Sequence, residues 1–537
     1  MAFPVETFYR SMTSRGALGY SGAPAPHRLF MSQQEHTATH RLEERFRKIA
    51  RLEHAETFLD WDRSVMMPPG GNAPRADALA ELASLTHELR ADPCVGTWLD
   101  EAEHDVEAGV AATVERASLR EMRREWLDAS AVPSDLVRAQ VFAGARCEQG
   151  WRTQRPANDW HGFLDNFRPV VKLAREEAAA RQAAAPARFK SPYDALLDRH
   201  CRGDDQALVT RVFDALRTRL PALLQEVTEK QESRDALPAG HYPVAAQKAL
   251  SERVMRRLGF DFENGRLDTS LHPFSTGVRG DQRITTRYRE SEFFDALQAT
   301  AHETGHASYE SGLPIAHEGL PLGQSRNMCI HESQSLLFEK HLMLSQVYVG
   351  AVLGDIHEHL PTTQNIGAAQ LWRQATRVVP SFIRVEADEI GYPLHVMLRH
   401  DIESALINGS MEAESVADAW EEGMQSAFGL SVGDEHSKGC LQDIHWTDGS
   451  FGYFPSYTLG AVNAAQIMDT IRAHEPDWLA RLAAGDTAFV RDWLAAAVWS
   501  KGRLCESQEL MVAATGGGTD ADYLVRHLEA RYLDERD

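Results

Sequence analysis

Helical periodicity runs through almost the whole chain from about Arg41 onward, and it restricts the possible folds more than any other feature. Apolar residues in 41–60 recur at spacings of three, four and six, close to one face of a helix. The segment 66–71, Met-Met-Pro-Pro-Gly-Gly, interrupts this pattern because paired prolines and glycines cannot continue a helix. Helical periodicity resumes at 75–87, around 113–127 and at 164–182. The sequence therefore predicts an all-α, mainly helical protein.

One segment gives a clear strand signal. Residues 282–288 are rich in β-branched and aromatic side chains and follow Gly280 and Asp281. We therefore expect one small β-sheet inside the helical body. The sequence contains no internal repeat and no long linker, so residues 36–537 are predicted to form a single domain. The three glycines at 516–518 are interpreted as a loop between helices, because no strand precedes them.

The first 30 residues are rich in Gly, Pro and Ser and carry a single acidic residue, Glu6. They lack the apolar segment that a secretory signal requires. We expect residues 1–35 to be a disordered N-terminal extension, with a transit-like leader as the alternative.

Charge and cysteine content exclude several classes of protein. The net charge of −22 argues against a nucleic-acid partner, because binding phosphates needs a basic surface. No stretch approaches the roughly 20 apolar residues that span a bilayer, so no membrane association is expected. The six cysteines are scattered without a Cys-x-x-Cys pair, which favours a reducing, cytoplasmic location.

A metal-binding motif lies in the segment 293–310, FFDALQATAHETGHASYE. Apolar residues at four-residue steps predict a helix, on which His302 and His306 stand one turn apart on the same face. That spacing allows two imidazoles to bind one zinc ion, and Glu303 stands beside the first of them as a candidate general base. The alternative is a helix with two partly exposed histidines.

A catalytic zinc needs a third protein ligand. Position 312 is Gly, which excludes a third histidine six residues after His306. Glu332 is the candidate, because 331–339 predicts a helix that begins after the Gly- and Pro-bearing loop 311–323. The alternative role for Glu332 is that of a surface carboxylate. His331 is a candidate for orienting a ligand through a hydrogen bond.

Two other histidine clusters are weaker metal-site candidates. His357 and His359 would lie about 200° apart on a helix and cannot share one ion. His317 and Glu318 have no partner at ligand spacing. A solvated helix face is the favoured interpretation of the first cluster.

These residues resemble the carboxypeptidase Taq family of zinc metallocarboxypeptidases, from about residue 40 to the C-terminus. Six short patterns carry the resemblance: His272-Pro273-Phe274, Asp281-x-Arg283-x-Thr285, His302-Glu303-x-x-His306, His331-Glu332-Ser333-Gln334, Ile383-Arg384-x-x-Ala387-Asp388 and Gly439-x-x-Gln442-Asp443-x-His445-Trp446. Leu336, Phe338 and Asn327 depart from the residues usual in the family, which bears on packing or specificity.

The resemblance implies a two-lobed helical body with a deep active-site groove, similar to neurolysin and angiotensin-converting enzyme. It implies an enzyme that releases single amino acids from peptide C-termini with broad preference and spares proline. It further implies one zinc ion per chain (with Co²⁺ as a substitute) and a homodimer.

The chemistry of peptide hydrolysis suggests roles for further residues. The oxyanion of the tetrahedral intermediate needs positioned donors, and His445, Tyr453 and Tyr457 are candidates. His445 and Tyr457 rank first, although each aromatic residue has a core position as its alternative role. The substrate's terminal carboxylate needs a fixed cation, which Arg can supply bidentately.

Arg384 is the first candidate for binding that carboxylate, and Arg283 on the predicted strand is the second. The resemblance adds His272 to the substrate-binding candidates. As an alternative, Arg384 forms a structural ion pair with one of the neighbouring carboxylates at 386, 388 and 389.

Two other functions remain compatible with the sequence. An endo-acting oligopeptidase would share the same metal chemistry and differ only at the end of the groove. A helical scaffold with a structural zinc would have no use for Glu303 beside the ligand, which argues against it.

Overall fold

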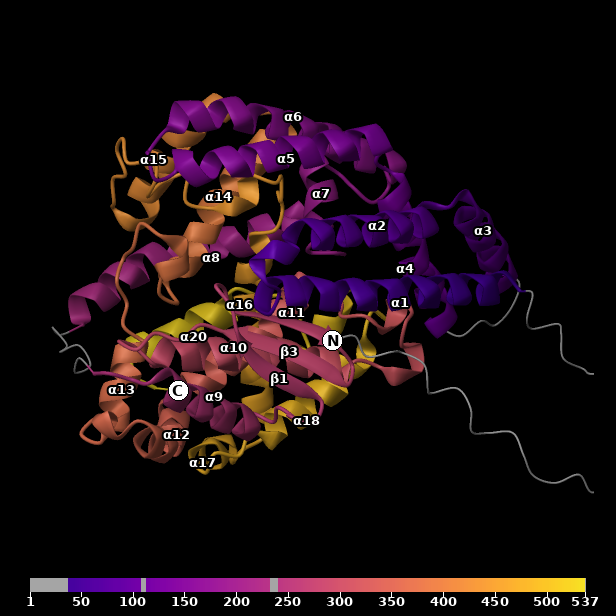
Figure 1. Ribbon diagram of the computed structural model, residues 1–537. Helices are drawn as coiled ribbons and strands as arrows, with labels where there is room; N and C mark the ends of the chain where they lie inside the picture. The colour runs from indigo at the N-terminus through magenta and orange to yellow at the C-terminus, as the bar shows by residue number, and fades with distance from the viewer. Residues whose placement is uncertain (1–36, 108–112, 232–239, 537) are drawn as a thin grey trace, which may run out of the picture.

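The computed structural model describes residues 37–107, 113–231 and 240–536. It is a mostly helical body with one small sheet, which confirms the predicted fold class (Figure 1). The extension predicted at 1–35 lies outside the described residues. Among the described residues, every helix is too short or too polar to traverse a lipid bilayer.

The helices before the sheet follow the sequence pattern closely. Helix α1 begins after Thr37, whose hydroxyl accepts from the His40 N–H at 3.2 Å, and it ends just before the predicted break at 66–71. The helices in this part are α1 (Ala38–Val65), η2 (Pro69–Gly71), α2 (Asn72–Ala91), α3 (Pro93–Glu107), α4 (Thr113–Ser130), α5 (Ser134–Gln154), α6 (Trp160–Ala184), α7 (Pro192–Leu197), α8 (Gln206–Lys230) and α9 (Val244–Arg257).

The sheet has three strands, β1 (Gly265–Thr269), β2 (Phe274–Val278) and β3 (Asp281–Thr286), in the order β1-β3-β2. The predicted strand is the central one, β3, and it ends two residues earlier than expected. It pairs in parallel with β1 and antiparallel with β2. Gly280 makes the tight turn between β2 and β3 with a positive φ of 82°.

The chain after the sheet is again helical. Its elements are α10 (Phe294–Gly312), η3 (Ile315–His317), η4 (Pro321–Gly323), α11 (Met328–Leu336), the π-helix η5 (Leu337–Met343), α12 (Gln346–His359), η6 (Pro361–Thr363), α13 (Ala368–Ala375), η7 (Arg384–Glu386), α14 (Gly391–Asn408), η8 (Ala413–Ser415), α15 (Val416–Phe428), η9 (Ile444–Trp446), α16 (Pro455–His474), α17 (Trp478–Ala483), α18 (Ala488–Ala497), η10 (Trp499–Lys501), α19 (Ser507–Thr515) and α20 (Asp522–Tyr532). Gly516 ends α19 in the left-handed conformation, so 516–518 is the predicted loop.

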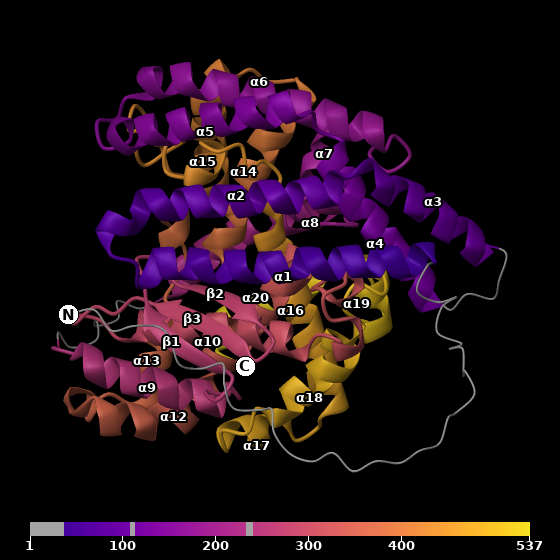
Figure 2. The same ribbon diagram turned by 45° about the vertical axis from the view of Figure 1, so that its right-hand side comes forward.

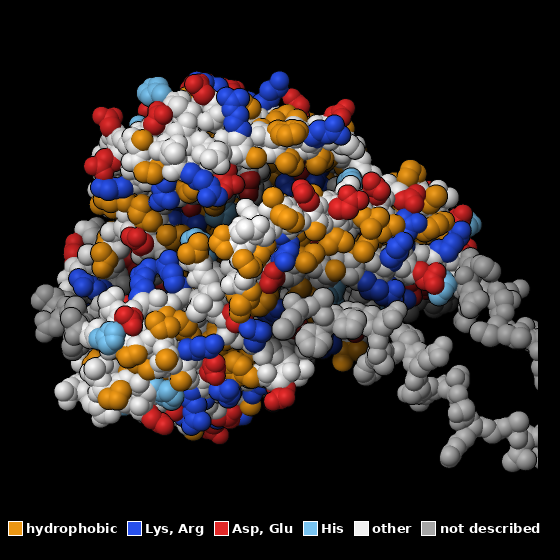
Figure 3. All heavy atoms as spheres, in the orientation of Figure 1, with side chains coloured by type: hydrophobic (Ala, Val, Ile, Leu, Met, Phe, Trp, Pro, Cys, Tyr) orange, Lys and Arg blue, Asp and Glu red, His pale blue; other side chains and the backbone are white. Residues whose placement is uncertain are grey.

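The elements form two lobes, with the α1–α2 hairpin running alongside both (Figures 1 and 2). In both views α5, α6, α14 and α15 lie in one lobe, and the sheet, α9, α12, α17 and α18 lie in the other. On the face shown in Figure 3, basic and acidic side chains are interspersed, and apolar side chains gather over α1 and α2.

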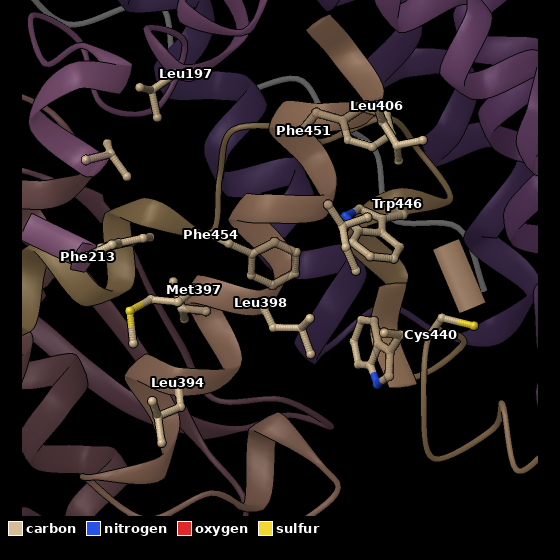
Figure 4. Packing of buried hydrophobic residues seen from close by; sticks show 14 of the residues in the cluster. Leu197, Phe213, Leu394, Met397, Leu398, Leu406, Cys440, Trp446, Phe451 and Phe454 are labelled. Atoms are coloured by element: carbon tan, nitrogen blue, oxygen red, sulfur yellow. The ribbon is translucent and has the colours of Figure 1, made fainter. Parts of the chain in front are cut away.

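Each lobe has its own large hydrophobic core. The first contains Trp446, Phe451 and Phe454, shown packed with their neighbours in Figure 4. The second contains residues of α9, α10, α12 and the C-terminal half of α16. Helices α11 and α16 contribute to both: Cys329 lies in the first core and Ile330 in the second. The segment that carries Glu332 is therefore anchored where the two cores meet.

Candidate active site

Three of the predicted site residues lie together at the contact between α10 and α11. One ligand atom each from His302, His306 and Glu332 falls within 4.8 Å of the others. Nε2 of His302 lies 3.8 Å from Glu332 Oε1, and Nε2 of His306 lies 3.6 Å from Oε2. We call these three residues the metal cluster. Two imidazole nitrogens and a carboxylate facing a common point are a donor set that suits zinc.

Two glycines let the helices around the metal cluster approach closely. A Cβ atom at Gly305 would lie 2.6 Å from the backbone of α11 at Gln334 and Ser335. A Cβ atom at Gly460 on α16 would lie 2.7 Å from Cβ of Glu332. Both distances are shorter than non-bonded carbon contacts allow. A side chain at either position would therefore displace the helix that carries the third ligand.

A carboxylate fixes the orientation of His302. Its Nδ1–H donates to Glu339 Oε2 at 2.8 Å, and the other oxygen of Glu339 pairs with Lys340 Nζ at 2.6 Å. Both residues belong to the π-helix that continues α11. Burial lowers the pKa of His302, but Glu332 and Glu339 together raise it to about 9. The local charge therefore favours a cation at this point.

A second imidazole fixes the orientation of His306. Nδ1 of His306 lies 2.5 Å from Nδ1 of His331, and Nε2 of His331 lies 2.8 Å from Glu310 Oε1. His331 thus has the orienting position anticipated for it. Glu310 also lines a cavity of about 520 Å³ between α1, the end of β2 and the residues that follow α10. Both ligand imidazoles use Nδ1 within the protein and leave Nε2 for an ion.

Glu303 lies beside the metal cluster and is almost completely buried. Glu303 is only 7 % exposed to solvent. Burial raises the pKa of Glu303 to about 7, assisted by the carboxylates of Glu332 and Glu339 and opposed by His302. A carboxyl group that gains and loses a proton near neutral pH suits general acid–base chemistry.

A second buried cluster carries net positive charge. It contains Arg384, Arg399 and Asp443, and we call it the arginine cluster. Asp443 Oδ1 accepts from Nε of Arg384 at 3.1 Å and from Nη2 at 2.9 Å, while Oδ2 accepts from Arg399 Nε at 2.5 Å. Burial opposes ionisation of Asp443, but the two guanidiniums lower its pKa to about 2. The ion-pair partner of Arg384 is therefore Asp443.

The carboxylates near Arg384 in sequence have other partners. Asp388 accepts from the backbone N–H groups of Val379, Ile390 and Gly391. Glu389 pairs with Arg531 at 2.9 Å. The sequence-based alternative was right that Arg384 forms an ion pair, but the partner is Asp443, and two of the three neighbouring carboxylates are engaged elsewhere.

Three tyrosines and a histidine lie between the two clusters. Tyr453 and Tyr457 have ring centroids 5.3 Å apart and meet edge to face. His445 packs on Tyr453, and burial followed by the charge of Arg384 lowers the pKa of His445 to about 4. Its neutral imidazole can therefore donate or accept near neutral pH. The carboxylate of Glu332 affects the pKa of both tyrosines, which places them near the metal cluster.

Tyr392 is a site residue that the sequence reasoning did not select. Its hydroxyl accepts from Arg384 Nη1 at 2.5 Å, and its ring meets that of Tyr457 edge-on at 5.8 Å. It stands at the second position of α14, eight residues after Arg384. A tyrosine following the Ile383–Asp388 pattern was the available signal, but nothing in its spacing distinguishes it from a core residue.

The remaining candidates lie in and beside the sheet. Arg283 pairs with Asp281 at 2.9 Å, and its guanidinium lies over the rings of Phe58 and Trp61 on α1. It joins the sheet to the N-terminal hairpin. His272 is exposed in the connection between β1 and β2, where its backbone carbonyl accepts from the hydroxyl of Ser270. Neither side chain has a described contact with the metal cluster.

The imidazoles of His357 and His359 bond to the protein backbone. Nε2 of His357 bonds to the carbonyl of Ile366, and Nδ1 of His359 bonds to the carbonyl of Asp355. Among the residues that the structure describes, the metal cluster is the one group of three or more potential ligands at binding distance.

Comparison with known proteins agrees with this geometry. The family model for carboxypeptidase Taq (M32) metallopeptidases matches residues 41–532. Thermostable carboxypeptidase 1 of Thermus thermophilus is 34% identical over 499 residues, covering 90% of this chain and 96% of the relative. Carboxypeptidase 1 of Bacillus subtilis is 30% identical, with the same coverage of each chain.

Solved structures give the same result. Metallocarboxypeptidase 1 of Trypanosoma cruzi superposes with a TM-score of 0.89 at 37% identity, covering 92% of this chain and 99% of its own. The M32 carboxypeptidase of Deinococcus radiodurans superposes with a TM-score of 0.87 at 30% identity, covering 93% and 99%. By sequence and by structure, the chain belongs to the carboxypeptidase Taq family of metallopeptidases.

Proposed function

We propose that this metallocarboxypeptidase releases single amino acids from the C-termini of peptides with one zinc ion held by His302, His306 and Glu332. The observation that carries the proposal is the metal cluster itself. Both imidazoles are oriented through Nδ1, so both Nε2 atoms face the Glu332 carboxylate. Zinc would supply Lewis-acid activation of a water molecule and of the scissile carbonyl.

Glu303 is proposed as the general base. It accepts a proton from the attacking water and then delivers it to the leaving amine, a pair of transfers that requires a pKa near neutrality. Burial holds the pKa of Glu303 at about 7, which supports both roles. Its position one residue after His302 keeps it beside the metal cluster without making it a ligand.

His445 and Tyr457 are proposed to donate hydrogen bonds to the oxyanion. The support for Tyr457 is the influence of Glu332 on its pKa, and the support for His445 is its packing on Tyr453, beside Tyr457, together with burial that keeps the imidazole neutral. Donors held in place before the reaction stabilise the developing charge more than water does. Arg384 is proposed to supply the cation for the terminal carboxylate, while Arg283 and His272 have less support because their contacts lie at the sheet.

A peptide pool tests the proposal. The zinc-loaded chain should release C-terminal residues from free-acid peptides, lose activity with a chelator and fail on the matching C-terminal amides. Internal cleavage of the amides would favour an endopeptidase. Broad preference, sparing of proline, the homodimer and the cytoplasmic location remain predictions that the same pool, light scattering and fractionation can measure.

A further inference from the structure

The arginine cluster has an unbalanced positive charge in a buried place. Arg384 is 5 % exposed, Arg399 is 0 % exposed and Asp443 is 8 % exposed. One carboxylate lies between two guanidiniums, so the three groups in contact carry an excess of one positive charge. A buried charge without a partner is costly. Aromatic rings over both guanidiniums offset part of this cost, and an additional anion would balance the charge.

The hydrogen bonds of Arg384 show where that anion fits. Nε and Nη2 each donate one N–H to Asp443, and Nη1 donates one N–H to Tyr392. A guanidinium has five N–H groups, so one on Nη1 and one on Nη2 have no acceptor among the described residues. Two parallel N–H groups match the two oxygens of a carboxylate.

Tyr392 adds a third donor at the same place. Its hydroxyl oxygen accepts from Arg384, and the hydroxyl proton has no acceptor among the residues that the structure describes. A hydroxyl that accepts from a cation becomes a stronger donor. Its ring is held edge-on by Tyr457, which stands one turn before the Gly460 contact with Glu332. Tyr392 and Arg384 thus both lie against Tyr457, on the helix that contacts Glu332 through Gly460.

We propose that Tyr392 is a substrate-binding residue that donates a hydrogen bond to the terminal carboxylate of the peptide, with Arg384 binding the same carboxylate from behind it. The carboxylate supplies the negative charge that the arginine cluster lacks. The inference rests on the proposed function and adds to it a residue that selects free acids over amides.

Equilibrium binding to the zinc-loaded full-length chain separates this role from a structural one. The background is Glu303→Gln, which prevents turnover, and the probes are an N-blocked dipeptide with a free carboxylate and its C-terminal amide. We expect Tyr392→Phe to weaken binding of the acid about tenfold and to leave the amide unchanged, because one charge-assisted hydrogen bond is lost. Phenylalanine keeps the ring that packs against Tyr457 and Arg384. Tyr523→Phe on α20 is the matched control and should bind both probes as the parent does.

Three results would contradict the inference. An unchanged ratio of acid to amide affinity in Tyr392→Phe would overturn it directly. A fall in kcat with unchanged KM, measured with Glu303 restored, would assign Tyr392 to the oxyanion instead. A parent that binds acid and amide equally would overturn the proposed exopeptidase function itself, and the inference with it.

Discussion

The metal cluster and the arginine cluster are opposites in charge. Around the first, burial together with Glu332 and Glu339 raises the pKa of Glu303, burial together with Glu339 raises that of Glu332, and the local charge favours a cation. In the second, two guanidiniums share one carboxylate, and the local charge favours an anion. Neither arrangement would stabilise the fold by itself, because burying a charge without a partner costs free energy. The two imbalances are the basis for the proposed direction of the site, with a cation at one end and the substrate carboxylate at the other.

The largest expected effect tests the metal end. Glu303→Gln removes the proton acceptor and leaves the three ligands in place, so kcat should fall by about 10²- to 10⁴-fold with zinc content unchanged. Steady-state kinetics and metal analysis measure the two quantities. Glu358→Gln, an exposed position on α12, is the control. Parent-like turnover in Glu303→Gln would exclude Glu303 as the base.

The next effect tests the arginine end. Asp443→Asn leaves the charges of Arg384 and Arg399 buried without a counterion, so the free energy of unfolding should fall by about 3–5 kcal/mol. Urea unfolding measures it, and Asp434→Asn at an exposed position is the control. A loss below about 1 kcal/mol would show that the cluster is not held by this carboxylate.

The lowered pKa of Asp443 predicts how the stability of the folded chain depends on pH. The pKa of Asp443 is about 2 in the folded chain and about 3.9 when unfolded, so its contribution is complete above about pH 4 and is lost as the pH falls toward 2. The shift corresponds to roughly 2 kcal/mol. The Tm of Asp443→Asn should therefore vary less than the parent's between about pH 5 and pH 3. Parallel curves would contradict this assignment.

A smaller effect is expected for the carboxylate that orients the first ligand imidazole, His302. Glu339→Gln replaces the charged acceptor of His302 by a neutral one, and zinc affinity should fall by about 10- to 100-fold. Competition with a chromogenic chelator measures the affinity without reference to activity. Glu358→Gln is again the control, and an unchanged affinity would show that Glu339 does not tune the ligand.

The smallest effect is expected for Glu310, which contacts the ligand His306 only through His331. Glu310→Gln keeps an oxygen that can accept from His331 Nε2, and His331 stands between it and His306. The fall in zinc affinity should stay below about tenfold and below that of Glu339→Gln. The reverse order would mean that the relay through His331 controls the metal cluster more strongly than the direct contact.

The sequence predicted the metal end well because its geometry is local. His302 and His306 share a helix face by spacing alone, and Glu310 continues that face four residues later. Glu339 follows Glu332 by seven residues, close to two turns, and that spacing was an unused signal. The π-helix that carries Glu339 has no comparable signature in the sequence.

The arginine end was only partly predictable. Arg384 and Asp443 stand in two separate sequence patterns, but no local rule pairs residues from η7 with residues before η9. The prediction that Arg384 pairs with a carboxylate close to it in the sequence was wrong. Asp388 accepts hydrogen bonds from backbone N–H groups, and Glu389 forms an ion pair with α20. Tyr392 was missed although its partner Arg384 lies only eight residues earlier, because its spacing does not distinguish it from a core residue.

By itself, the sequence determined the helical class, the central strand and the two imidazoles one turn apart, because each follows from residue spacing within a single element. Only the tertiary structure decided how α11 packs between α10 and α16, through Gly305 and Gly460, and which carboxylate faces Arg384. Packing distances and buried charge depend on segments far apart in the chain, and residue spacing within one element carries no information about them.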